Sequence, residues 1–174
     1  KIFWETHKPM LCLKSGRTPE GAKAVSSHTG SLAGSDSVYD ALLVQSGVQR
    51  VDTIAELFDS AALYCTQPLP RGGRVAIITN AGGPGIMATD SAVRFGLKLA
   101  ELSPATQEKL KASLPSTASL RNPIDVIGDA RADRYRSAVR TVLEDDQVDM
   151  GMVILTPQSM TDVEETAAVV PDAV

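Results

Sequence analysis

The sequence lacks several features that would place it in common classes of protein. No apolar run approaches the roughly 20 residues that a membrane-spanning helix requires. The first residues include an early acidic side chain and no apolar core, so they do not resemble a secretory signal. The two cysteines, Cys12 and Cys65, do not have the spacing of metal ligands, and we therefore expect a reduced, cytoplasmic protein without a metal site. A net charge of −4 argues against a basic surface that binds nucleic acid.

What is present is typical of a soluble globular protein. Hydrophobic residues make up 43% of the 174 positions and charged residues 22%, which is enough for one ordinary domain or two small ones. The first half predicts strands at 9–14 and 48–51, a helix at 35–47, and a second helix opened by the capping pair Thr53 and Glu56. Between the first strand and the first helix, the polar residues 15–34 read as one long loop.

The second half alternates strands and helices regularly. Strands are predicted at 74–79, 97–102, 123–127 and 148–155, and helices at 85–95, 104–114 and 131–144, with Thr161 opening a last helix. The apolar run 148–155 is unbroken, as in a strand covered on both faces. This alternation predicts an α/β fold with parallel sheets.

The Pro- and Gly-rich residues 68–73 divide the chain into a first unit at 1–67 and a second unit at 74–174. We expect both units to be incomplete, because the first makes a poor core and the second stops before a final strand. The sequence therefore reads as part of a longer chain.

One histidine lies in a stretch of small residues, Ser26 to Gly34. Imidazole titrates near neutral pH, so His28 could be a nucleophile or a general base. The glycines of this stretch allow unusual backbone conformations and the close approach of a bulky group. An ordinary surface histidine is the alternative, and it is the more common one on composition alone.

Two strand-to-helix turns could bind an anion through backbone N–H groups. The first is Thr-Asn-Ala-Gly-Gly-Pro-Gly at 79–85, which has neither the G-x-G-x-x-G pattern nor the Lys-Ser/Thr of a P-loop. The second is Leu-Thr-Pro-Gln-Ser-Met-Thr-Asp at 155–162, at the carboxyl edge where open α/β sheets bind ligands. A tight turn in the first case, and simple capping by Ser159 or Thr161 in the second, remain open.

Other polar residues favour structural roles. Asp125 and Asp129 could contact a ligand, although capping or turn formation is more common for such positions. The turn from Lys14 to Arg17 could contact a phosphate, although solvated charges at the end of a strand are more frequent.

Together, five segments resemble a known family. They are Lys-Ser-Gly-Arg-Thr at 14–18, Ser-His-Thr-Gly-Ser-Leu-Ala-Gly at 27–34, Thr-Asn-Ala-Gly-Gly-Pro-Gly at 79–85, Asn-Pro-Ile-Asp-Val at 122–126 and Ile-Leu-Thr-Pro-Gln at 154–158. In this order they resemble the ADP-forming acetyl-CoA synthetases, or NDP-forming acyl-CoA synthetases, which are relatives of succinyl-CoA synthetase. The resemblance covers nearly the whole chain and implies two flavodoxin-like, succinyl-CoA synthetase-like units.

The resemblance implies that His28 is a phosphohistidine that carries a phosphoryl group between acyl phosphate and ADP. It implies that Gln158, Ser159, Met160 and Thr161, together with Gly82 and Gly83, bind phosphate, and that Ser27, Thr29 and Gly30 support the histidine. No metal ligand is implied within the chain.

The resemblance also implies partners and cofactors. CoA, ATP or ADP, Mg²⁺ and phosphate serve the complete enzyme and are mostly bound by CoA-binding and ATP-grasp domains of the same chain or of a partner subunit. A small carboxylic acid or its acyl-CoA is the substrate, and an oligomer is expected, with no nucleic acid or membrane. The chain alone is expected to be inactive.

Two alternatives remain. Some relatives fuse this module to a protein acetyltransferase, where it acts as a ligand-sensing regulatory module. Many of those lack the histidine, and its presence here favours the ligase. A plain flavodoxin-like interaction module is the other alternative.

Overall fold

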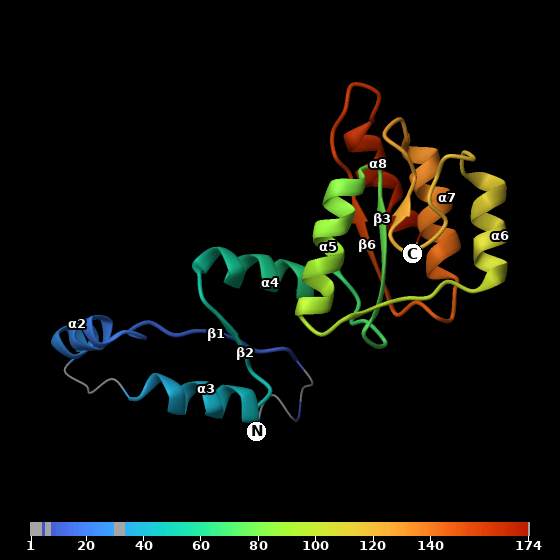
Figure 1. Ribbon diagram of the computed structural model, residues 1–174. Coiled ribbons are helices and arrows are strands. Elements are labelled where there is room, and N and C mark those ends of the chain that lie inside the picture. Colours follow the sequence, from blue (N-terminus) through green and yellow to red (C-terminus); the bar gives the residue numbers. More distant parts are fainter. Residues whose placement is uncertain (1–4, 6–7, 30–33, 174) are drawn as a thin grey trace. The chain divides into compact units, whose positions relative to one another are not determined.

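The computed structural model describes residues 5, 8–29 and 34–173. The chain folds into two compact units, Lys1–Leu69 and Pro70–Val174. The order of strands and helices along the chain can be followed in Figure 1.

The first unit is built on two parallel strands. Strand β1 (Leu11–Leu13) pairs with β2 (Gln49–Val51), with Leu11 opposite Gln49. Helices α2 (Pro19–Thr29) and α3 (Asp36–Gln45) lie between these strands in the sequence, and α4 (Ile54–Thr66) follows β2. Thr53 caps α4 by accepting a hydrogen bond from the Glu56 amide at 3.0 Å, which confirms the predicted capping pair.

The first unit has little buried apolar surface of its own. Val51 is the one buried hydrophobic residue among its described residues. Large apolar side chains on α3 and α4 are exposed, including Val44 and Phe58. Its shape therefore depends strongly on hydrogen bonds and ion pairs.

Helix α2 corrects the sequence prediction of one loop at 15–34. The Thr18 hydroxyl accepts a hydrogen bond from the Gly21 amide at 3.1 Å, and Pro19 occupies the first helical position. A capping hydroxyl followed by proline is a typical helix start. Ser27, His28 and Thr29 therefore lie in the last turn of a helix, whereas Gly30 lies outside the described residues.

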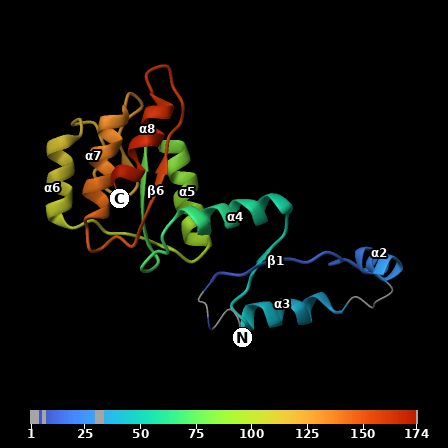
Figure 2. The same ribbon diagram turned by 180° about the vertical axis from the view of Figure 1, so that it is seen from behind.

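The second unit is a parallel sheet with helices on both faces. Its strands are β3 (Arg74–Thr79), β4 (Lys98–Leu99), β5 (Ile124–Asp125) and β6 (Met150–Ile154), and its helices are α5 (Gly82–Arg94), α6 (Pro104–Ser113), α7 (Ala132–Leu143) and α8 (Val163–Val169), followed by the short helix η1 (Pro171–Ala173). Strand β3 pairs with the other three strands, all in parallel. The two faces can be compared in Figures 1 and 2.

Alternation along β3 divides the core of the second unit. Ala76 and Ile78 pack with Tyr135 and other residues of the α6 and α7 side, whereas Val75 and Ile77 pack against Ala92 of α5. Successive side chains of a strand point to opposite faces, so one strand that is buried from Val75 to Thr79 supplies both halves of the core.

The Asn122 side chain makes hydrogen bonds to backbone groups of β3 next to the part of β3 that pairs with β4. Its side-chain oxygen accepts from the Ile77 amide at 2.9 Å, and its amide group donates to the carbonyls of Val75 and Ala100. The predicted strand at 97–102 is therefore short. The Asn122 side chain binds backbone groups of β3 at the end of the part paired with β4 and just before the part paired with β5.

Two further predictions for the second unit were wrong. Strand β6 pairs only with β3 among the described residues, and its Gly151 and Met152 are exposed, so it is not covered on both faces. The last helix begins at Val163 with Asp162 at the N-cap, because the Thr161 hydroxyl is already used within the preceding turn.

No helix within the described ranges combines the length and the apolar character needed to cross a bilayer.

Candidate functional site

His28 lies on the surface of the first unit. It is exposed in the last turn of α2. The neighbouring Ser27 hydroxyl donates to the Ala24 carbonyl at 2.7 Å, so it serves its own helix. Among the described residues, no hydrogen bond or ion pair holds the His28 imidazole. An exposed, unpaired imidazole is free to react with a group brought to it.

The turn after β3 presents two open glycines. Gly82 and Gly83 begin α5 and are exposed, and a Cβ atom built on either would meet no heavy atom within 4 Å. The first N–H groups of a helix have no partner within the helix. Gly85 differs, because its Cβ would lie 2.9 Å from the Thr79 methyl group. Gly82 and Gly83 thus leave room for an anion, whereas Gly85 lets α5 approach β3.

The turn after β6 is held by its own hydrogen bonds. The backbone amide of Gln158 donates to the Thr161 hydroxyl at 2.8 Å. The Thr161 hydroxyl and backbone amide both donate to the backbone carbonyl of Gln158. Within the part of the chain that the structure describes, the amides of Ser159 and Met160 donate to no acceptor. These two N–H groups are the donors that this turn leaves for a ligand.

Two contacts join the loops at the carboxyl edge of the second sheet. Asn80 donates from its side-chain amide to the Thr156 carbonyl at 2.9 Å and accepts from the Thr156 amide at 2.8 Å. Gly128 lies so close to Gln158 that a Cβ would be 2.8 Å from Oε1. The ends of β3, β5 and β6 therefore meet at one edge. Within the described ranges, no hydrogen bond joins Gly82 or Gly83 directly to residues 158–161.

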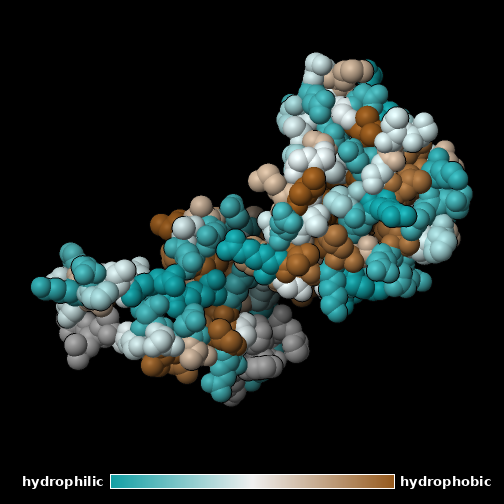
Figure 3. Space-filling model, viewed as in Figure 1, coloured by the Kyte–Doolittle hydropathy of each residue, from teal (hydrophilic) through white to brown (hydrophobic). Residues whose placement is uncertain are grey.

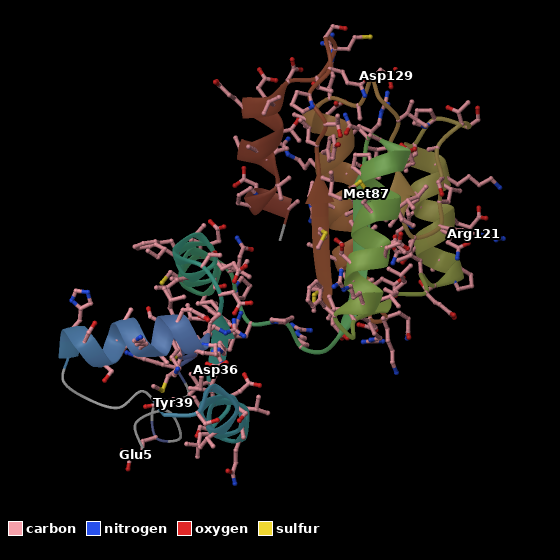
Figure 4. The ribbon with its side chains drawn as sticks, turned by 60° about the vertical axis from the view of Figure 1, so that its left-hand side comes forward. Glu5, Asp36, Tyr39, Met87, Arg121 and Asp129 are labelled. Atoms are coloured by element: carbon pink, nitrogen blue, oxygen red, sulfur yellow. The ribbon has the colours of Figure 1, made fainter. Side chains whose placement is uncertain are left out.

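Asp125 and Asp129 make structural contacts at the same edge. Asp125 accepts from the Ile127 amide at 2.8 Å, within its own turn. Asp129 pairs with Arg134 at 2.5 Å, and this hydrogen bond lowers the pKa of the carboxyl group. Figure 4 shows Asp129 in the loop beyond the sheet. These interactions fit the capping and turn roles expected from the sequence.

An open cleft of about 600 Å³ lies between the start of α7 and helix α8. Arg131, Arg136, Asp162 and Glu165 line it. Its mixed charge does not select one sign of ligand. The described residues contain no group of three or more histidine, cysteine or acidic side chains that could hold a metal ion.

Sequence reasoning missed a charged cluster in the first unit. Lys14, Arg17 and Arg50 all pair with Asp36. The sequence feature that could have predicted it is Arg50 inside the short strand 48–51, because a half-buried cation requires an acceptor. Its partner Asp36 could not be identified, since its position indicated only the start of a helix.

Two protein families match the chain. Residues 4–64 match the family described as succinyl-CoA ligase like flavodoxin domain. Residues 75–171 match the family described as Ligase-CoA domain. Each match falls within one of the two compact units of the fold.

Curated relatives carry ligase names. The chain is 45% identical to the 4-hydroxybutyrate–CoA ligase (ADP-forming) of Nitrosopumilus maritimus, over 94% of this chain and 23% of that protein. It is 46% identical to the acetate–CoA ligase (ADP-forming) II subunit alpha of Pyrococcus furiosus, over 84% of this chain and 32% of that protein. The chain thus spans a quarter to a third of the length of these relatives.

A solved structure has the same fold. The dinucleotide forming acetyl-coenzyme A synthetase 1 of Ca. Korarchaeum cryptofilum, in complex with phosphate and ADP, superposes with a TM-score of 0.88 at 34% identity. The match covers 95% of this chain and 36% of that one. It agrees with the parallel α/β units predicted from the sequence. The chain therefore belongs to the NDP-forming acyl-CoA synthetase family, with a succinyl-CoA ligase like flavodoxin domain followed by a Ligase-CoA domain.

Proposed function

We propose that the chain is part of an acid–CoA ligase that couples cleavage or formation of an acyl-CoA to ADP and ATP through phosphorylation of His28. The observation that carries the proposal is the exposed, unpaired imidazole of His28 in a domain whose relatives are named ADP-forming CoA ligases.

His28 would act as a nucleophile. In the direction that forms ATP, phosphate displaces CoA from the acyl-CoA and gives an acyl phosphate. The imidazole then attacks phosphorus, the carboxylate leaves, and phosphohistidine forms. ADP attacks the same phosphorus, and free imidazole returns. Two transfers through a covalent intermediate replace one difficult transfer.

The second unit would bind the phosphoryl group through backbone amides. Suitable donors are the free backbone N–H groups of Ser159 and Met160. The backbone N–H groups of Gly82 and Gly83 are also suitable, because no neighbouring atom would crowd an anion there. The Gly82 and Gly83 amides lie at the start of α5, where the helix dipole favours negative charge. Those of Ser159 and Met160 lie in the turn before α8 and would act as hydrogen-bond donors alone. Gln158 and Thr161 would hold the shape of the turn, because their polar groups bond to each other. Ser27 and Thr29 would support the histidine from the same helical turn.

CoA, the nucleotide and Mg²⁺ would be bound by other domains. The described residues offer no acidic cluster for Mg²⁺, so we assign none of them to the metal. A CoA-binding domain and an ATP-grasp domain, in the same chain or in a partner subunit, would supply these sites. Residues 1–174 alone are expected not to cleave acyl-CoA. The domain limits 1–67 and 74–174 are also part of the proposal.

The regulatory alternative finds less support. The relatives described above carry ligase or synthetase names, and none of these names mentions an acetyltransferase. His28 is present and accessible. Both observations favour the ligase.

A chase experiment tests the proposal. The complete protein is incubated with radiolabelled ATP and Mg²⁺, freed of nucleotide, and then given ADP. We expect an acid-labile protein phosphate that returns to ATP on addition of ADP. A label that ADP does not remove, or no label, would contradict the proposal. The Arg121→Gln variant changes an exposed residue that has no part in the proposed function. As the control, it should take up and return the label as wild type does.

A further inference from the structure

We propose that Asp36, together with Lys14, Arg17 and Arg50, forms a positioning clamp that holds both ends of the segment carrying His28. The inference rests on the proposed function only for what His28 does. The clamp itself consists of contacts among described residues. None of its members is proposed to touch the phosphoryl group.

The clamp closes the segment at its base. The segment 18–35 lies in the sequence between the turn after β1 and the start of α3, and its described residues include α2 with His28. Arg17 immediately precedes this segment and Asp36 immediately follows it, and Arg17 Nε lies 3.5 Å from Asp36 Oδ2. Lys14 Nζ lies 3.4 Å from Asp36 Oδ1. Two ion pairs thus join the departing chain to the returning chain.

Arg50 anchors the clamp to the sheet. It lies in the middle of β2, and its Nη2 donates to Asp36 at 2.6 Å while Nη1 donates to Asp40 at 3.2 Å. Arg17 also pairs with Asp52, which directly follows β2. Figure 4 marks Asp36 and Tyr39 on α3. The Lys14 ammonium lies 4.8 Å from the centre of the Tyr39 ring, which adds a cation–π contact to the same cluster.

Two of the three cations in the clamp are more shielded than those of ordinary surface ion pairs, whereas Arg17 is 46% exposed. The side chains of Lys14 and Arg50 are 12% and 10% exposed, and that of Asp36 is 27% exposed. Hydrogen bonding by Arg50 is the main cause that lowers the pKa of Asp36. Shielded pairs of this kind are weakened less by salt than exposed pairs. Asp36 is therefore ionised, and able to pair with these cations, throughout the neutral range.

Close packing fixes α2 to the same turn. Gly16 has a φ of +75°, and a Cβ built on it would lie 2.9 Å from Val25 Cγ2. A Cβ on Gly21 would lie 3.1 Å from the Gly16 Cα. Only glycine accommodates both the backbone conformation and these approaches. The turn that carries Lys14 and Arg17 therefore also holds the body of the helix that presents His28.

Fixing both ends restricts where the imidazole can be. A closed segment samples fewer positions than one held at a single end, and reaction rates depend steeply on the placement of the reacting groups. Loss of the clamp should therefore slow phosphorylation of His28 while leaving the affinity for the nucleotide unchanged, since the nucleotide binds elsewhere in the proposed enzyme.

The test compares wild type with Arg17→Gln, Asp36→Asn and the double variant, which break the clamp from its two sides. Asp36→Glu keeps the charge, and Asp40→Asn removes only the exposed second partner of Arg50. One readout is tryptic cleavage after Lys23 in α2, measured relative to cleavage after Lys111 in α6. The other is the rate of His28 phosphorylation by ATP in the complete protein, at several ATP concentrations.

We expect cleavage after Lys23 to rise roughly tenfold in both single variants, because local opening becomes more frequent. Phosphorylation should slow by roughly tenfold, well within the ~100-fold that a misplacement of about 1 Å can cause, with an unchanged half-saturating ATP concentration. Asp36→Glu should recover part of the rate, Asp40→Asn should resemble wild type, and the double variant should be no worse than either single variant.

Unchanged cleavage and unchanged phosphorylation in folded Arg17→Gln protein would overturn the clamp. Should Asp36→Asn fail to fold, the half-exposed Arg17 still provides the test. If wild-type His28 is not phosphorylated at all, the proposed function fails, and the cleavage ratio decides the clamp separately.

Discussion

At the scale of single residues, charged side chains make several of the contacts that join distant parts of the chain. Arg74 and Asp149 join the start of β3 to the residue before β6: Arg74 Nε donates to Oδ2 at 2.9 Å, Nη2 donates to Oδ1 at 2.7 Å, and the Arg74 backbone amide donates to Oδ2 at 2.8 Å. The side-chain hydrogen bonds from Arg74, followed by the backbone hydrogen bond, lower the pKa of Asp149 to about 2. A bidentate pair of this kind has defined geometry as well as attraction.

This pair predicts a dependence of stability on pH. The pKa of Asp149 is lower in the folded state than its ordinary value of 3.8, so its stabilising contribution is complete above pH 4 or so and is lost as the pH falls through about 2. Between these pH values, wild type should lose more of its free energy of unfolding than Asp149→Asn does. Urea unfolding at several pH values measures this difference, and identical slopes for the two proteins would contradict the assignment.

At the scale of elements, one helix contains two glycines with opposite requirements. Gly83 and Gly85 both lie in the first turn of α5, but only Gly85 is buried, against Thr79 and Pro123. Figure 3 shows apolar surface over α5, which includes the exposed Ile86 and Met87. The helix thus packs on the sheet through Gly85 and leaves Gly82 and Gly83 open to solvent.

This difference predicts unequal effects of the same substitution. Gly85→Ala should destabilise the second unit by about 1–3 kcal/mol, because its methyl group overlaps the Thr79 side chain. Gly83→Ala should change stability little, because its methyl group would meet open space, yet it should slow phosphoryl transfer by filling the proposed anion space. Thermal unfolding and the ATP labelling rate measure the two effects. Equal stability changes, or full transfer activity in Gly83→Ala, would contradict them.

The sequence predicted most elements because their signals are local. The capping pair at Thr53 and the start of α6 at Pro104 lie where the sequence placed them, whereas α5 begins at Gly82, three residues before the predicted helix at 85–95. Helix α2 was missed because its small and polar residues form no apolar stripe, although Thr18 and Pro19 mark its start. The short β4 could not be predicted, since it depends on the Asn122 side chain from more than twenty residues away.

The candidate site could be predicted only in part. The composition around His28 and the two turns at Gly82 and Ser159 is visible in the sequence, because reactive and small residues are themselves the signal. The bonding between Gln158 and Thr161, and the convergence of three cations on Asp36, required the structure. Contacts between distant residues leave no periodic pattern that reasoning from one sequence could use.

At the scale of the whole molecule, the proposed chemistry is divided between two units. In the proposed function, the first unit would supply the imidazole and the second would supply backbone amides at the carboxyl edge of its sheet. The matched regions make up 23% and 32% of two relatives. The proposed function therefore gives this chain the carriage and stabilisation of a phosphoryl group, and leaves the binding of CoA and nucleotide to other domains.

The most direct measurement is to locate the phosphate that ATP transfers to the complete protein. The sequence contains two histidines, His7 and His28, so each provides the control for the other. We predict that mass spectrometry under non-acidic conditions finds the phosphate on His28, that His28→Ala abolishes the labelling, and that His7→Ala retains it. Undiminished acid-labile labelling of His28→Ala would contradict the central claim.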